Sequence, residues 1–143
     1  MKTIHHVFEI DAAPDKVWDA LTTELGLASW WSTTVSAPRR EIGASVRFTF
    51  RGDFNPVMQI GTLREQQQLD WTCVDGHRKW ADNTFRFQLE AIEGMQTRVR
   101  FWQNYAVELA DDDYGTYNFN WGYYLQSLCE YCETGVGKPF APA

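Results

Sequence analysis

The feature that most constrains the fold is one long amphipathic segment at the end of a chain that otherwise shows strand-like patterns. Apolar and aromatic residues recur at helical spacing from Trp121 to Cys132, and Gly135 and Pro139 follow as helix-stop signals. Residues 43–109 alternate instead with a period of two, which is typical of strands. Because one helix must then cover the apolar face of a sheet, its bulky side bounds either a packed core or a cavity.

The remaining segments predict the order of the elements. Strand patterns cover residues 4–10, 35–40, 46–50, 57–67, 69–74, 85–91 and 99–105, and two short helices cover 14–22 and 23–31. Turn signals stand at Asp75-Gly76 and Glu93-Gly94. A run of three aspartates, residues 111–113, stands just ahead of the final helix, where negative charge suits the positive end of the helix dipole. The predicted fold class is therefore α+β.

Length, charge and cysteine content limit the classes of protein. A chain of 143 residues fits one domain, covering residues 1–143. A net charge of -6 with scattered basic residues argues against a nucleic-acid partner. No apolar run approaches the ~20 residues that a membrane span needs, and no signal peptide is recognisable. Three cysteines, an odd number, favour reduced thiols and a cytoplasmic location.

Cys129-x-x-Cys132 is the motif that comes nearest to a redox or zinc site. Both cysteines lie near the C-terminal end of the predicted helix, where the helix dipole disfavours a thiolate. A zinc site needs further ligands, and Cys73 and the histidines are scattered along the chain. The sequence therefore predicts three free thiols, no metal and no cofactor.

Aromatic content is high, with nine Phe, seven Trp and six Tyr among 143 residues. This aromatic content is typical of either a large hydrophobic core or a pocket that binds apolar ligands. No motif of a catalytic nucleophile occurs. Gln103 and Tyr105 are a polar pair on an otherwise apolar strand face, and they either satisfy each other or orient the polar end of a ligand. In an enzyme, Tyr105 would be the acid and Gln103 the oxyanion donor.

The loop at residues 77–82 is polar and is interpreted as solvated. The alternative is that His77 contacts an anionic ligand at the mouth of a cavity.

Two motifs, which follow one another in the same order as in a known family, resemble that family. The first reads Pro14-x-x-Val17-Trp18-x-Ala20-Leu21-Thr22, continued by Leu27-Ala28-x-Trp30-Trp31. The second reads Trp121-x-x-Tyr124-Leu125-x-Ser127-Leu128-x-x-Tyr131-x-Glu133-x-Gly135-x-Gly137-x-Pro139. The first resembles the opening of helix-grip proteins of the START/SRPBCC superfamily. The second resembles the closing helix of the branch named after the activator of the ninety-kilodalton heat-shock protein ATPase. The strand pattern between them agrees, so the resemblance spans nearly the whole chain.

The resemblance implies a curved, seven-stranded antiparallel sheet that grips the C-terminal helix, with two short helices after the first strand. It also implies a cavity between sheet and helix, lined from three sources. The helical insert would supply Trp30 and Trp31. The sheet would supply Phe48, Phe50, Phe85, Phe87, Phe101, Gln103 and Tyr105, and the final helix Trp121, Tyr124, Leu125 and Leu128.

The resemblance leaves three functions open, because one fold can serve several. The first is binding of a small hydrophobic molecule, lipid-, aromatic- or polyketide-like, without a cofactor. The second is a cyclase or hydrolase that acts on such a molecule, and the third is a chaperone-associated interaction module. A cavity above ~300 Å³ with one or two polar groups favours the first two. The identity of the ligand and the oligomeric state stay open.

Overall fold

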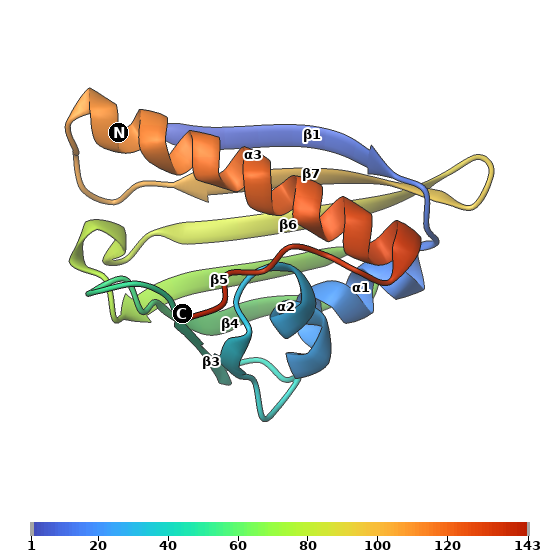
Figure 1. The fold of residues 1–143 in the computed structure, drawn as a ribbon, viewed down its shortest axis with the longest axis horizontal. Coiled ribbons are helices and arrows are strands. Elements are labelled where there is room, and N and C mark those ends of the chain that lie inside the picture. The colour runs from blue at the N-terminus through green and yellow to red at the C-terminus, as the bar shows by residue number, and fades with distance from the viewer. Residues whose placement is uncertain (1, 143) are drawn as a thin grey trace.

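The computed structural model describes residues 2–142, which form a curved antiparallel sheet and a long C-terminal helix (Figure 1). Within these residues the sheet has seven strands in the order β1-β7-β6-β5-β4-β3-β2. The strands are β1 (Thr3–Ile10), β2 (Thr34–Ser36), β3 (Ser45–Thr49), β4 (Val57–Arg64), β5 (Gln68–Asp75), β6 (Thr84–Ile92) and β7 (Gln96–Asn104). The helices are α1 (Pro14–Thr22), α2 (Glu24–Trp30) and α3 (Asp111–Thr134), and a 3₁₀ turn, η1, spans Arg78–Trp80. The predicted α+β helix-grip fold is confirmed.

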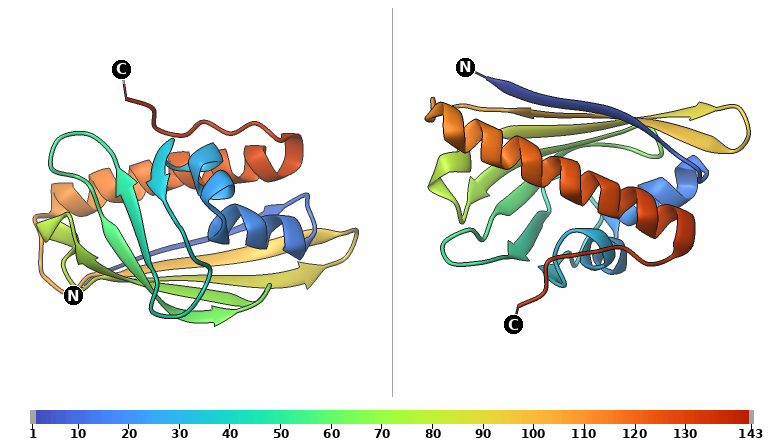
Figure 2. Two further views of the ribbon diagram at one scale, coloured as in Figure 1. Left: turned by 90° about the horizontal axis from the view of Figure 1, so that it is seen from below. Right: turned by 45° about the horizontal axis from the view of Figure 1, so that its top comes forward.

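The three helices lie on one face of the sheet, and β2 and β3 rise toward α3 at the curled edge (Figure 2). The helical insert of α1 and α2 packs tightly because Gly26 has no side chain. A Cβ atom on Gly26 would lie 2.6 Å from the Cα atom of Ala20, which no real side chain tolerates. Trp30, the last residue of α2, and Trp31, which follows it, are buried in the core, where Trp31 stacks on Trp121 of α3.

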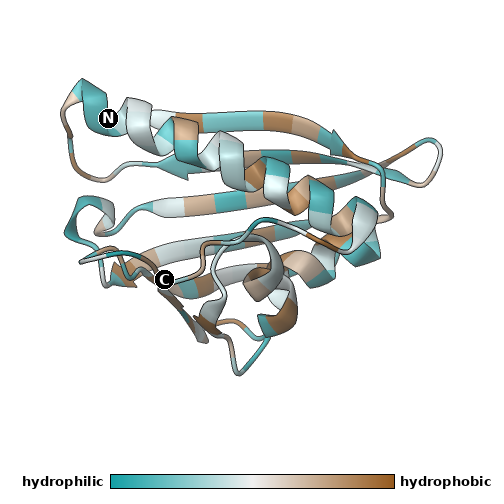
Figure 3. Ribbon diagram, in the orientation of Figure 1, coloured by the Kyte–Doolittle hydropathy of each residue, from teal (hydrophilic) through white to brown (hydrophobic). Residues whose placement is uncertain are grey.

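Strand faces follow the alternation of the sequence, and bands of hydrophilic and hydrophobic residues succeed one another along the strands (Figure 3). Phe85, Phe87 and Phe101 on the inner face are at most 1% exposed. Val7, on the outer face of β1, is 54% exposed. Phe87 of β6 is paired with Phe101 of β7 in the antiparallel register, so the inner face is continuous across the two strands.

Several predicted boundaries are wrong. The strand predicted for residues 99–105 already begins at Gln96 and ends at Asn104. The final helix begins at Asp111, so the three aspartates occupy its first turn instead of preceding it. Their negative charge still faces the positive end of the helix dipole. The strand predicted for residues 57–67 ends at Arg64, because Gln66 adopts the left-handed conformation (φ 61°) in a turn. The edge strand predicted for residues 35–40 is limited to Thr34–Ser36.

The C-terminal tail turns back along α2 after α3 ends (Figure 2). Gly135 ends the helix as predicted, with φ 87° and its N–H donating to the carbonyl oxygen of Tyr131 at 2.8 Å. Ser127 fixes the tail, since its Oγ donates to the carbonyl of Trp30 at 2.8 Å and accepts from the N–H of Lys138 at 2.7 Å. The N–H of Phe140 then donates to the carbonyl of Trp31 at 2.8 Å.

The three cysteines are free, as predicted, and all three are buried. Burial raises the pKa of the Cys73 and Cys129 thiols to about 11 and that of Cys132 to about 12. Residues 2–142 contain no cluster of three or more His, Cys, Asp or Glu side chains placed to hold a metal ion. Over the same residues, every helix is too short or too polar to cross a bilayer.

Thiol reactivity should reflect this burial. At pH 8 a disulfide reagent is expected to react slowly with the native protein, because buried thiols with raised pKa values form little thiolate. After denaturation without a reducing agent, the same reagent should count three thiols per chain. A count of one thiol would instead reveal a Cys129–Cys132 disulfide.

Candidate functional site

A pocket of about 310 Å³ opens to solvent between α3, the turn after β3, η1 and the C-terminal tail. Its lining is mainly aromatic and comprises Trp31, Phe50, Arg51, Phe54, Trp80, Tyr117, Asn120, Trp121, Tyr124 and Phe140. A larger hollow of about 630 Å³ lies beside the turn between β5 and η1, but small and charged loop residues line it. Small-molecule sites have apolar walls with a few polar groups, so the aromatic pocket is the candidate site.

Three indoles form the floor of this pocket. The ring centroids of Trp31 and Trp121 are 5.1 Å apart, those of Trp80 and Trp121 6.1 Å, and those of Trp31 and Trp80 6.5 Å. Their planes lie within 27° of one another in each pair. Each of the three side chains is only 2% exposed. The floor is therefore a cluster of stacked, nearly parallel indoles that is enclosed by its surroundings.

A chain of hydrogen bonds positions Trp121. Its Nε1 donates to Oε1 of Gln103 at 2.7 Å, and Nε2 of Gln103 donates to Oδ1 of Asn83 at 2.9 Å. Gln103 and Asn83 are both fully buried. Because both ends of the amide are engaged, Gln103 orients the indole instead of facing the pocket.

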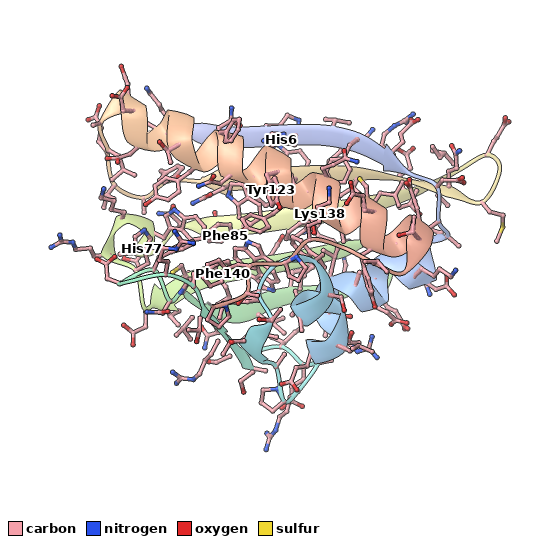
Figure 4. All side chains as sticks on the ribbon, in the orientation of Figure 1. His6, His77, Phe85, Tyr123, Lys138 and Phe140 are labelled. Carbon is pink, nitrogen blue, oxygen red and sulfur yellow. The ribbon has the colours of Figure 1, made fainter. Side chains whose placement is uncertain are left out.

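Further aromatic rings form the rim. Phe50 lies 5.6 Å from Phe140 and 4.7 Å from Phe54 between ring centroids, and Phe54 meets His77 edge-on at 4.7 Å. These contacts link the C-terminal tail, the turn after β3 and the loop before η1. Phe140 and His77 accordingly lie in the same half of the molecule (Figure 4). Three segments that are distant in the sequence thus build one rim.

His77 and Tyr117 form a polar pair at one side of the pocket. Nε2 of His77 and the hydroxyl of Tyr117 are joined by a hydrogen bond of 2.8 Å. Burial raises the pKa of Tyr117 to about 12, and the carboxylates of Asp113 and Asp53 add to this rise. Burial lowers the pKa of His77. The imidazole and the phenol therefore form an uncharged pair at one side of the pocket.

Four of the predicted lining residues, Trp31, Phe50, Trp121 and Tyr124, line this pocket. The others lie outside its lining and are buried in the core: Trp30, Phe48, Phe85, Phe87, Phe101, Gln103, Tyr105, Leu125 and Leu128. Trp30 stacks on Trp31 at 5.9 Å and its Nε1 donates to the carbonyl of Ala20 at 2.8 Å. Trp30 therefore supports the floor from the core.

The alternative in which Gln103 and Tyr105 satisfy each other is wrong. Gln103 bonds Trp121 and Asn83, whereas Tyr105 packs edge-on against Tyr114 at 4.9 Å. Within residues 2–142 the Tyr105 hydroxyl has no hydrogen-bond partner. Burial raises the pKa of Tyr105, and the nearby Trp80 indole opposes the rise. Neither Gln103 nor Tyr105 lines the pocket, so neither is placed there as an acid or an oxyanion donor.

Six lining residues were missed by the sequence reasoning: Arg51, Phe54, Trp80, Tyr117, Asn120 and Phe140. Tyr117 stands four residues before Trp121, so it lies on the same face of α3. The helical spacing counted from Trp121 onward did not include it. Trp80 belongs to the loop interpreted as solvated, yet it is buried. Phe54 and Phe140 lie in a turn and a tail, where no periodic pattern marks the direction of a side chain.

Fold and pocket together define a class of protein: a helix-grip protein with an open aromatic pocket beside its C-terminal helix. The chain belongs to the family described as activator of Hsp90 ATPase homolog 1-like proteins, whose model matches residues 11–133.

Solved structures agree with this assignment. The Aha1 dimer from Colwellia psychrerythraea is 32% identical, with a TM-score of 0.84 over 96% of this chain and 100% of that chain. A protein from Staphylococcus saprophyticus is 20% identical, with a TM-score of 0.77 over 99% and 98% of the two chains. CalU16 from Micromonospora echinospora is 18% identical, with a TM-score of 0.68 over 93% and 77%. The structures from Staphylococcus saprophyticus and Micromonospora echinospora are too different in sequence to show more than a shared fold. No curated protein matched the sequence.

Proposed function

We propose that this chain binds a small hydrophobic molecule in the aromatic pocket beside α3. The observation that carries the proposal is the floor of three aligned indoles, Trp31, Trp80 and Trp121, in a pocket that opens to solvent. The pocket volume of about 310 Å³ lies at the lower end of the range for small-molecule sites. The ligand is therefore a compact molecule with an aromatic or acyl body.

Filling the pocket mouth should weaken this binding. Asn120 is an exposed residue of α3 that lines the pocket, so Asn120→Phe adds apolar volume there while leaving the core intact. Titration of the wild-type protein with naphthalene and acyl compounds should change tryptophan emission saturably. In Asn120→Phe the apparent affinity should fall about tenfold, the equivalent of losing roughly one buried apolar group of the ligand.

Gln126→Phe is the matched control, because Gln126 is an exposed residue of α3 outside the pocket. This variant should bind like the wild-type protein, and both variants should keep the wild-type melting temperature within a few degrees. The proposal fails if no compound in a panel of aromatic and acyl molecules gives a saturable response. It also fails if Asn120→Phe and Gln126→Phe bind equally well.

A second candidate function is contact with a chaperone of the Hsp90 class, and the description of the matched family favours it. The pocket-filling variant separates the two candidates. If the pocket serves a small molecule, Asn120→Phe loses binding of that molecule. If the chain acts on a chaperone through another surface, Asn120→Phe keeps its effect on the ATPase rate of the chaperone.

A further inference from the structure

The rim of the aromatic pocket carries one cation, Arg51, in the turn that follows β3. Its Cζ lies 5.6 Å from the ring centroid of Phe140, so the guanidinium is held over an aromatic face. Arg40, Arg86 and Arg98 each pair with a carboxylate. Within residues 2–142 the Arg51 guanidinium has no such ion pair. Its donors are thus available to a ligand.

Tyr124 and Asn120 add neutral donors to the lining of the same pocket. Both lie on α3, and Tyr124 meets Phe50 edge-on with 6.3 Å between ring centroids. Burial raises the pKa of Tyr124, while the positive charge of Arg51 opposes the rise. The phenol therefore stays protonated at neutral pH, and its O–H, like the Asn120 amide, can donate to an acceptor.

Tyr117, which lies about two turns of α3 before Tyr124, has carboxylates in its neighbourhood. The carboxylates of Asp113 and Asp53 act on Tyr117, and Asp113 is itself paired with Lys79 at 3.1 Å. Negative charge on a ligand is thus disfavoured beside Tyr117 and favoured beside Arg51. The chain as a whole carries a net charge of -6, so attraction of an anion to this pocket must come from the local cation.

We infer that the molecule bound in this pocket is a hydrophobic acid, whose apolar body lies on the indole floor and whose carboxylate meets Arg51. The inference rests on the proposed function and narrows it to one chemical class. A guanidinium presents paired N–H donors that match the two oxygens of a carboxylate. The contact of Arg51 with Phe140 restrains the guanidinium at the rim. The side chain therefore loses less conformational entropy when it binds a carboxylate.

Matched acid and neutral probes test this inference. Naphthalene-2-carboxylate is compared with naphthalene-2-carboxamide, and decanoate with decanol, by tryptophan emission or calorimetry at pH 7. The wild-type protein should bind the acid of the better-bound pair about two- to fivefold more tightly than its neutral partner, because an exposed charge pair gives a modest gain. This preference should shrink at high salt. The better-bound pair shows whether the body is aromatic or acyl.

Arg51→Gln should abolish the preference for the acid while the affinity for the neutral probe stays unchanged. Arg47→Gln removes the same charge from an exposed residue of β3 outside the pocket, and it should keep the preference. Equal binding of acid and neutral probe by the wild-type protein, or a preference that survives Arg51→Gln, would overturn the inference and leave the proposed function standing. Failure of all four probes to bind would contradict both.

Discussion

A chain that ends at Ala110 is expected not to fold. This truncation removes α3 and with it Trp121, Leu125 and Leu128, which are at most 3% exposed. Each buried side chain of this size contributes ~1.5–3 kcal/mol of transfer free energy, against a total stability of ~5–15 kcal/mol for a typical domain. The truncated protein also exposes the apolar inner face of the sheet. Circular dichroism should therefore show no cooperative thermal transition.

A chain that ends at Phe140 is the control for this truncation. It removes residues 141–143 and keeps the backbone pairing of Phe140 with Trp31. Its thermal transition should match that of the full chain. A soluble fragment 1–110 that melts cooperatively would show that α3 is an accessory to a sheet that is stable by itself.

Gln103→Leu is expected to lower the free energy of unfolding strongly. The substitution keeps the approximate volume of the side chain but leaves Nε1 of Trp121 and Oδ1 of Asn83 without their partner. An unpaired buried polar group costs ~1–3 kcal/mol, so the free energy of unfolding should fall by ~2–5 kcal/mol. Urea denaturation measures this loss, and ligand affinity should fall with it because Trp121 loses its fixed orientation.

Gln59→Leu is the matched control, because Gln59 is an exposed residue of β4. Its free energy of unfolding should stay within ~0.5 kcal/mol of the wild-type value. If the free energy of unfolding of Gln103→Leu also stays within this range, Trp121 is held by packing alone and the hydrogen-bond chain does not contribute to stability.

The sheet and its inner face could be predicted because alternation is a local signal. Phe85 and Phe87 alternate with polar residues on β6, and both are buried as that pattern indicates. Boundaries depend on single conformations that a pattern does not show. Gln66 is polar like its neighbours, yet its left-handed backbone ends β4 and starts a hairpin turn. The start of α3 was missed because acidic residues suit both a segment before a helix and its first turn.

The pocket could be predicted only where its residues belong to a periodic element. Trp121 and Tyr124 are on the helical face that the spacing defines, and both line the pocket. Trp80 and Phe140 reach it through tertiary contacts of a loop and a tail. Gln103 was correctly placed inside, but a sequence cannot show that both ends of its amide are satisfied by Asn83 and Trp121.

The most direct test of ligand binding at the indole floor is a ¹H–¹⁵N NMR titration that follows the side-chain N–H of each of the seven tryptophans. On addition of naphthalene-2-carboxylate, the signals of Trp31, Trp80 and Trp121 should shift saturably with one dissociation constant. The signals of Trp18 and Trp102, which do not line the pocket, should stay in place. No saturable shift, or shifts that are largest at Trp102 on the outer face, would contradict a binding site at the indole floor.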